Sequence, residues 1–142
     1  MKVLLDTSVL VSALIESHPH HEWCLHWLQR VHRREVIGIV STHSLLELYA
    51  VLTRLPVHPP IVPAVALQLI EHNLYSKVEF VRLSIDDYMN LIKLLVEREI
   101  RGGRVYDALI AAAGQQAQVE AVITLNPSHF EQLIRGVPVL SP

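Results

Sequence analysis

Three acidic side chains lie in stretches of the sequence that are otherwise apolar: Asp6 in VLLDTSVLV, Glu47 in SLLELYAVL and Asp107 in RVYDALIAA. A carboxylate that is buried without a partner carries a large desolvation cost, so each of the three needs a compensating group. Asp86 and Asp87 differ, because they stand together in SIDDYMN at an expected helix start, where capping and solvation account for them. Carboxylates gathered in apolar surroundings suit a hard divalent cation such as Mg²⁺ or Mn²⁺, which prefers oxygen ligands.

Helix capping is the alternative role for these acids. Each lies near the N-terminus of an expected helix, where free backbone N–H groups and the helix dipole favour a carboxylate. Ser44 and Glu47 even have the S-x-x-E spacing of a capping box. Thr7 and Ser8, beside Asp6, are equally able to cap a helix or to orient Asp6 or a bound water. Whether the three acids cap helices or bind a metal therefore depends on whether the fold brings them together.

The elements that position the acids alternate along the chain. Strands are expected at 1–5, 36–40, 78–83, 121–125 and 137–140, and helices at 7–16, 20–34, 41–55, 64–74, 85–99 and 106–118, with Pro56 ending the third helix. No repeat, low-complexity tract or linker divides the 142 residues, so a single domain spanning 1–142 is expected. Short apolar strands separated by helices predict an α/β fold with a mostly parallel sheet covered on both faces.

A parallel sheet would bring the three acids together. Asp6 follows the first strand, Glu47 lies just inside the helix after the second strand, and Asp107 opens a helix that leads to the fourth strand. Helices that follow parallel strands begin at one edge of the sheet, where ligands usually bind. Clustered carboxylates repel one another, and a shared Mg²⁺ or Mn²⁺ relieves that repulsion. Asp6 is therefore predicted to be a metal ligand.

Four segments also resemble a known family. LLDTSVLVSAL, SLLELYAVLTRLP, GGRVYDALIAAAG and VITLNPSHF are similar, in order and spacing, to the characteristic segments of PIN-domain proteins, above all VapC-type toxins of prokaryotic toxin–antitoxin pairs. The resemblance implies a three-layer α/β/α domain with a mostly parallel sheet of about five strands. It also implies a Mg²⁺- or Mn²⁺-dependent endoribonuclease, with Asp6, Glu47 and Asp107 as metal-binding and catalytic residues, and a VapB-like antitoxin as partner.

One segment departs from the family pattern. Many PIN domains have a fourth acid in the segment that matches TLNPSHF, whereas this chain has Asn126 and His129 but no carboxylate there. Asn126 is a candidate ligand through its carbonyl oxygen or through water, and Thr124 and His129 are candidates for site support. The missing acid also leaves open a PIN-like RNA-binding or regulatory module with weakened or lost hydrolysis. A metal-dependent phosphatase on a similar sheet is a third hypothesis.

Charge and hydropathy limit the partners. A net charge of −2 argues against wholesale electrostatic attachment to nucleic acid or membrane. Local RNA contacts are still expected from Arg98, Arg101 and Arg104, which precede Asp107, and more weakly from Arg54, although a solvated helix end would explain the first three as well. Hydrophobic residues make up 51% of the chain, which predicts apolar surface for a homodimer and for an antitoxin segment.

The cysteine and histidine residues give evidence on the cellular compartment and on a zinc site. One cysteine, Cys24, cannot form an internal disulfide, which favours a cytoplasmic protein, and no apolar run is long enough to span a bilayer. Cys24 has three histidines near it in the sequence, His20, His21 and His26. A zinc site is nevertheless disfavoured, because structural zinc sites usually combine two separated clusters of ligands and the chain has no second Cys/His cluster. The histidines expected to be ordinary surface or partly buried residues are His43, His58 and His72.

Overall fold

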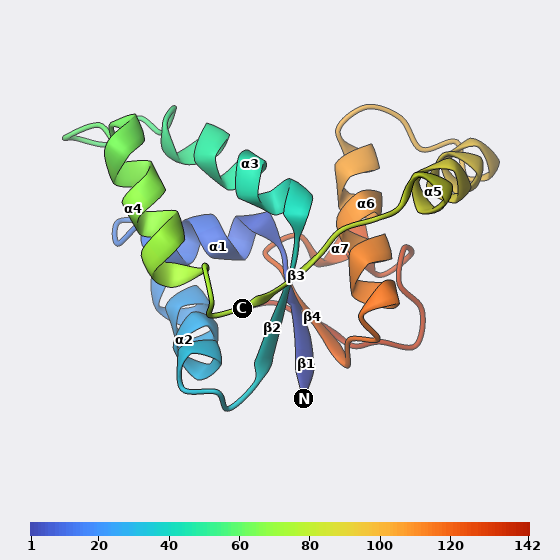
Figure 1. Cartoon of the computed structure of the whole chain (residues 1–142), viewed down its shortest axis with the longest axis horizontal. Coiled ribbons are helices and arrows are strands. Elements are labelled where there is room, and N and C mark those ends of the chain that lie inside the picture. Colours follow the sequence, from blue (N-terminus) through green and yellow to red (C-terminus); the bar gives the residue numbers. More distant parts are fainter.

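Five strands form one sheet in which every pairing is parallel. The computed structural model describes all residues from Met1 to Pro142 (Figure 1). The strands are β1 (Lys2–Leu5), β2 (Ile37–Ser41), β3 (Glu79–Val81), β4 (Ala121–Ile123) and β5 (Val139–Leu140), in the spatial order β3-β2-β1-β4-β5. The register pairs Leu4 of the central strand with Ile39 on one side and Val122 on the other. The predicted parallel sheet is confirmed.

Helices cover both faces of the sheet. Figure 1 shows the sheet nearly edge-on, with α1 (Thr7–Leu14), α2 (His21–His32), α3 (Thr42–Leu52) and α4 (Pro63–Asn73) on one side. The other side holds α5 (Ile85–Glu97), α6 (Arg104–Gln116) and α7 (Pro127–Phe130). The predicted three-layer α/β/α architecture is therefore confirmed. No helix has both the length and the apolar character needed to cross a bilayer.

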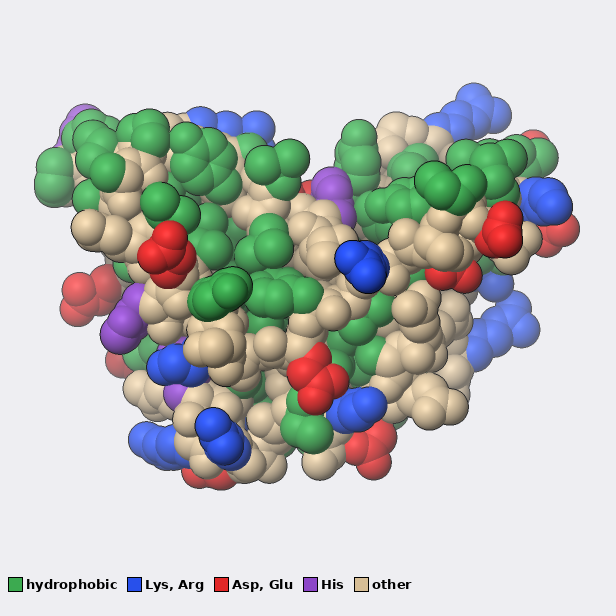
Figure 2. Space-filling view, viewed as in Figure 1, with side chains coloured by type: hydrophobic (Ala, Val, Ile, Leu, Met, Phe, Trp, Pro, Cys, Tyr) green, Lys and Arg blue, Asp and Glu red, His purple; other side chains and the backbone are tan.

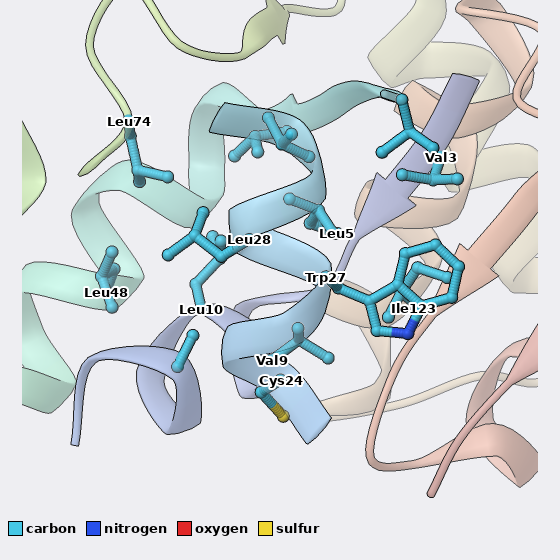
Figure 3. Packing of buried hydrophobic residues seen from close by; sticks show 14 of the residues in the cluster. Val3, Leu5, Val9, Leu10, Cys24, Trp27, Leu28, Leu48, Leu74 and Ile123 are labelled. Carbon is cyan, nitrogen blue, oxygen red and sulfur yellow. The ribbon is translucent and has the colours of Figure 1, made fainter. Parts of the chain in front are cut away.

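Alternation along the strands produces two separate cores. Val3 and Leu5 of β1 point into the cluster beneath α1–α4, which Figure 3 shows around Leu28 of α2. Leu4, between them in sequence, points into the cluster beneath α5–α7. Gly114 brings α6 close to this strand, because an added Cβ would come within 2.8 Å of Leu4 Cδ2. This close packing holds the helix that carries Asp107 against the centre of the sheet.

Two helices differ from the prediction, one in its end and one in being absent from it. Helix α3 ends at Leu52 rather than continuing to Leu55. A residue directly before proline is disfavoured in the helical conformation, so the chain leaves the helix before Pro56, and the Thr53 hydroxyl donates back to Tyr49 O at 2.8 Å. Helix α7 is absent from the prediction, because its four residues are too few to show helical periodicity.

The order of the strands reverses beside β1. The chain moves from β1 to β2 and β3 on one side of the sheet, and returns through α5 and α6 to β4 on the other side of β1. The first residue after β1, Asp6, donates its backbone N–H to Ile123 O of β4 at 3.1 Å. Open α/β sheets bind ligands outside the carboxyl ends of their strands at such a switch point.

Candidate active site

A cavity of about 490 Å³ opens at the carboxyl edge of the sheet, and all three acids line it. Asp6 comes from the junction of β1 and α1, Glu47 from the second turn of α3, and Asp107 from the first turn of α6. Figure 2 shows a notch in the molecular surface between the α3 side and the α6 side. The arrangement expected from the parallel topology, with the acids meeting at one edge, is present.

Asp6 is the most deeply buried of the three, with 4% of its surface exposed. Burial raises the pKa of its carboxyl group and the nearby charge of Asp107 adds to the rise, whereas hydrogen bonds from Ser8 and Thr124 oppose it. Both hydroxyls donate to Oδ2 at 2.8 Å, which leaves Oδ1 without a hydroxyl donor. Asp6 occupies the N-cap position of α1, but its side chain caps no backbone N–H. Helix capping therefore does not account for this acid.

The hydroxyl groups around Asp6 form a network between elements. Thr7 donates to Ser44 Oγ at 2.9 Å and so joins α1 to α3. Ser8 Oγ accepts the backbone N–H of Leu125 at 3.2 Å. Ser44 lies inside α3, which begins at Thr42, so the capping box proposed for Ser44 and Glu47 is not formed. The hydroxyl-bearing residues singled out beside Asp6 thus fix the walls of the cavity.

Glu47 is paired with a residue that the sequence analysis set aside. His43 Nε2 lies 2.7 Å from Glu47 Oε2, one helical turn away on α3. The His43 ring also stacks on the ring of Tyr106 from α6, with centroids 4.9 Å apart and an interplanar angle of 2°. Describing His43 as an ordinary histidine missed this contact. The available signal was its i,i+4 spacing from Glu47, which places both side chains on one face of the helix.

Asp107 is paired with His129, which was a candidate for site support. His129 Nδ1 lies 2.9 Å from Asp107 Oδ2. Burial raises the pKa of the Asp107 carboxyl group, His129 lowers it, the charge of Glu47 raises it and Arg104 lowers it. Asp107 thus interacts electrostatically with both other acids of the cavity.

The remaining candidate residues divide between two places. Asn126 and two histidines, His18 and His20, also line the acidic cavity, and nothing in the sequence analysis had placed these histidines there. A separate cavity of about 260 Å³ is bordered by the three predicted RNA-binding arginines: Arg98, Arg101 and Arg104. The fourth, Arg54, is exposed in the turn after α3 and lines neither cavity.

The donor set fits a hard divalent cation that keeps part of its hydration shell. Burial and mutual repulsion raise the pKa of Asp6 and of Asp107, and a bound cation would relieve both effects. No three His, Cys, Asp or Glu side chains lie close enough together to coordinate one ion directly. Mg²⁺ commonly binds through one or two carboxylates plus water, which this arrangement permits.

Comparison with known proteins identifies the family of this chain. The PIN domain family matches residues 3–134, and the chain belongs to this family. Ribonuclease VapC27 of Mycobacterium tuberculosis is 34% identical over 116 residues, covering 82% of this chain and 79% of the relative. The chain is thus similar in sequence to a VapC ribonuclease over most of its length.

Solved structures share the architecture. Mycobacterium tuberculosis VapC20, described as a Sarcin–Ricin loop cleaving toxin, has a TM-score of 0.65 at 17% identity, covering 84% of this chain and 86% of that chain. VapBC2 from Rickettsia felis, solved with a DNA fragment from its promoter, has a TM-score of 0.66 at 19% identity, covering 100% and 99%. At these identities the likeness establishes the fold.

Proposed function

We propose that this chain is a metal-dependent endoribonuclease and the toxin of a type II toxin–antitoxin pair. The observation that carries the proposal is the meeting of Asp6, Glu47 and Asp107 at one cavity of a PIN domain. Similarity to a protein named Ribonuclease VapC27 supports RNA as the substrate. No observation favours the alternative of a binding module without hydrolysis.

The acids would hold Mg²⁺ or Mn²⁺, with Asn126 as a neutral oxygen donor. Such an ion, when bound, increases the acidity of water and stabilises negative charge on a phosphate. Asp6 is suited to a binding role because Ser8 and Thr124 fix one oxygen and leave Oδ1 for a ligand. Hydrolysis adds water across a P–O bond, and in this proposal Glu47 or Asp107 would accept the proton that the attacking water loses.

The arginine cavity is proposed to hold the RNA backbone. Arg101 and Arg104 are exposed and lie just before Asp107, so phosphates bound there would be near the acidic cavity. Arg98 is partly committed, since Nη1 donates to Gln132 O at 2.6 Å. Arginine binds phosphate oxygens through charge-assisted hydrogen bonds. Arg54 remains a weaker candidate because it lines neither cavity.

The protein partners are proposed to be a VapB-like antitoxin and a second copy of this chain, acting in the cytoplasm. Figure 2 shows hydrophobic side chains gathered over the α3–α4 side and over α5. The exposed members include Leu46, Val65 and Leu67 on α3 and α4, and Ile85, Met89, Ile92 and Val96 on α5. Apolar surface of this extent is typical of proteins that bind partners. The VapBC2 structure supports the antitoxin by analogy of fold.

Cleavage of single-stranded RNA tests the proposed activity. The purified protein should cleave RNA with Mn²⁺ present, and EDTA or the substitution Asp6→Asn should abolish cleavage. Asn preserves the size of Asp6 and an oxygen for the two hydroxyls, but it removes the charge. Cleavage that survives both treatments would exclude this site, and tight RNA binding without cleavage would favour the binding module.

A further inference from the structure

We propose that His43 is a positioning residue that fixes Glu47 at the cavity, and that Tyr106 holds the His43 ring in place. The inference rests on the proposed function and concerns how one of its acids is oriented. It starts from two contacts of the same imidazole, one to Glu47 and one to Tyr106.

The hydrogen bond restricts a side chain that would otherwise be mobile. A carboxylate can only accept, so His43 Nε2–H must donate to Glu47 Oε2 across their 2.7 Å separation. Hydrogen bonds to a charged acceptor are shorter and stronger than neutral ones. A glutamate side chain loses conformational entropy when it is fixed in one rotamer. Because the imidazole already restricts Glu47 in the folded protein, little of that entropy remains to be lost when a ligand binds. The other carboxylate oxygen, Oε1, remains for the cavity that Glu47 lines.

The stacked tyrosine explains how the imidazole is itself oriented. The two rings are parallel within 2°, with centroids 4.9 Å apart, a separation typical of favourable aromatic pairs. Tyr106 is 50% exposed, so no surrounding core fixes this contact. It directly precedes Asp107 on α6, whereas His43 and Glu47 lie on α3. The pair therefore joins the two helices that carry two of the three acids.

A purely structural role for His43 is the alternative. An i,i+4 pair on a helix contributes a few tenths of a kcal/mol to helix stability, whatever the function of Glu47. Such a pair would affect unfolding but not ligand binding. A positioning role instead requires that the effect of His43 on ion binding disappears when Glu47 can no longer act. A double-mutant cycle separates the two roles.

The experiment compares His43→Leu, Glu47→Gln and the double variant. Electron paramagnetic resonance of free Mn²⁺ gives the dissociation constant, and thermal unfolding verifies that each variant is folded. His43→Leu should weaken Mn²⁺ binding about tenfold, as is usual when a partner of a ligand is removed. In the Glu47→Gln background the same change should have less than about a twofold effect. Cleavage of RNA by His43→Leu should show a lower kcat and an unchanged KM.

Conservative variants keep the inference falsifiable if His43→Leu does not fold. His43→Gln retains an N–H donor and should recover part of the Mn²⁺ affinity. Tyr106→Phe keeps the ring and should bind Mn²⁺ as the unmodified protein does, whereas Tyr106→Leu should bind it more weakly. Unchanged Mn²⁺ affinity in every His43 and Tyr106 variant, or an equal loss with and without Glu47, would overturn the inference alone. Absence of Asp6-dependent Mn²⁺ binding in the unmodified protein would overturn the proposed metal site as well.

Discussion

Thr124 and Asp6 are 118 positions apart in the sequence, yet the threonine hydroxyl donates to the aspartate Oδ2 at 2.8 Å. The contact exists because β1 and β4 are neighbours in the sheet, so the residues that follow each strand meet at the same edge. Both are almost fully buried. The bond fixes one oxygen of Asp6 and thereby determines which oxygen is left for a ligand.

Removing the Thr124 hydroxyl should weaken the site. Thr124→Val keeps the shape of the side chain, but it removes one of the two hydroxyl groups that donate to Asp6 Oδ2 and the acceptor of the Asn126 N–H. We expect a loss of about 1–3 kcal/mol in unfolding free energy, because the Asn126 N–H becomes unsatisfied and the buried Asp6 carboxylate keeps only the Ser8 hydroxyl as a donor. Mn²⁺ affinity should fall about tenfold. Thr124→Ser retains the hydroxyl and is the matched control; equal behaviour of the two variants would contradict the role of this bond.

Asp6 should destabilise the ion-free protein at neutral pH. Burial raises its pKa above the ordinary value of 3.8, so the folded state binds this proton more tightly than the unfolded state does. Stability therefore rises as the pH falls through the raised pKa and stops changing below the unfolded value. In EDTA, Asp6→Asn should be more stable than the unmodified protein near neutral pH, and this difference should shrink on acidification.

Denaturant unfolding across this pH range measures that difference. The comparison with Asp6→Asn removes contributions from the other titrating groups. If the Asn variant were less stable at neutral pH, the hydrogen bonds to the Asp6 carboxylate would have to stabilise the folded protein by more than the desolvation of the charge destabilises it.

The arginine cavity should contribute salt-dependent RNA affinity. Replacing Arg101 and Arg104 by Gln removes two candidate phosphate contacts, so the slope of log affinity against log salt should fall by about 1.4 for single-stranded RNA. Filter binding at several salt concentrations measures the slope. Arg33→Gln is the matched control, since Arg33 is exposed at the end of α2 that leads into β2, away from the carboxyl edge. An equal change in slope per arginine in the control would mean that the cavity has no special role.

Substituting Asn126 tests whether the absence of a fourth acid in the TLNPSHF segment weakens ion binding. Its side chain lines the acidic cavity and makes no hydrogen bond within the chain. Asn126→Asp adds a charged oxygen donor without adding bulk, so we expect Mn²⁺ to bind several-fold more tightly and cleavage to need less of the ion. Calorimetric titration with Mn²⁺ is the measurement. Weaker binding than in the unmodified protein would show that position 126 does not face the ion.

The sequence was sufficient to predict the sheet and the meeting of the acids. Apolar strands alternating with helices leave few arrangements open, and a parallel sheet places the residues after β1 and β2 at one edge with the start of α6. Asp6, Glu47 and Asp107 could therefore be placed together without coordinates. The burial of Asp6 likewise followed from its apolar neighbours.

The side-chain pairings could not be predicted in the same way. His129 meets Asp107, and His43 meets Tyr106, across distances set by the packing of α6 against its neighbours. Periodicity identifies the face on which a residue lies, but not the partner that packing brings to it. The presence of His18 in the cavity depends similarly on the course of the loop between α1 and α2.

Anomalous diffraction from a crystal soaked in Mn²⁺ tests the central claim most directly. We predict a peak in the cavity within about 2.5 Å of a carboxylate oxygen of Asp6 or Asp107, with water completing the coordination, and no peak in Asp6→Asn crystals. A peak elsewhere, or an empty cavity at Mn²⁺ concentrations that support RNA cleavage, would contradict the claim that these acids hold the ion.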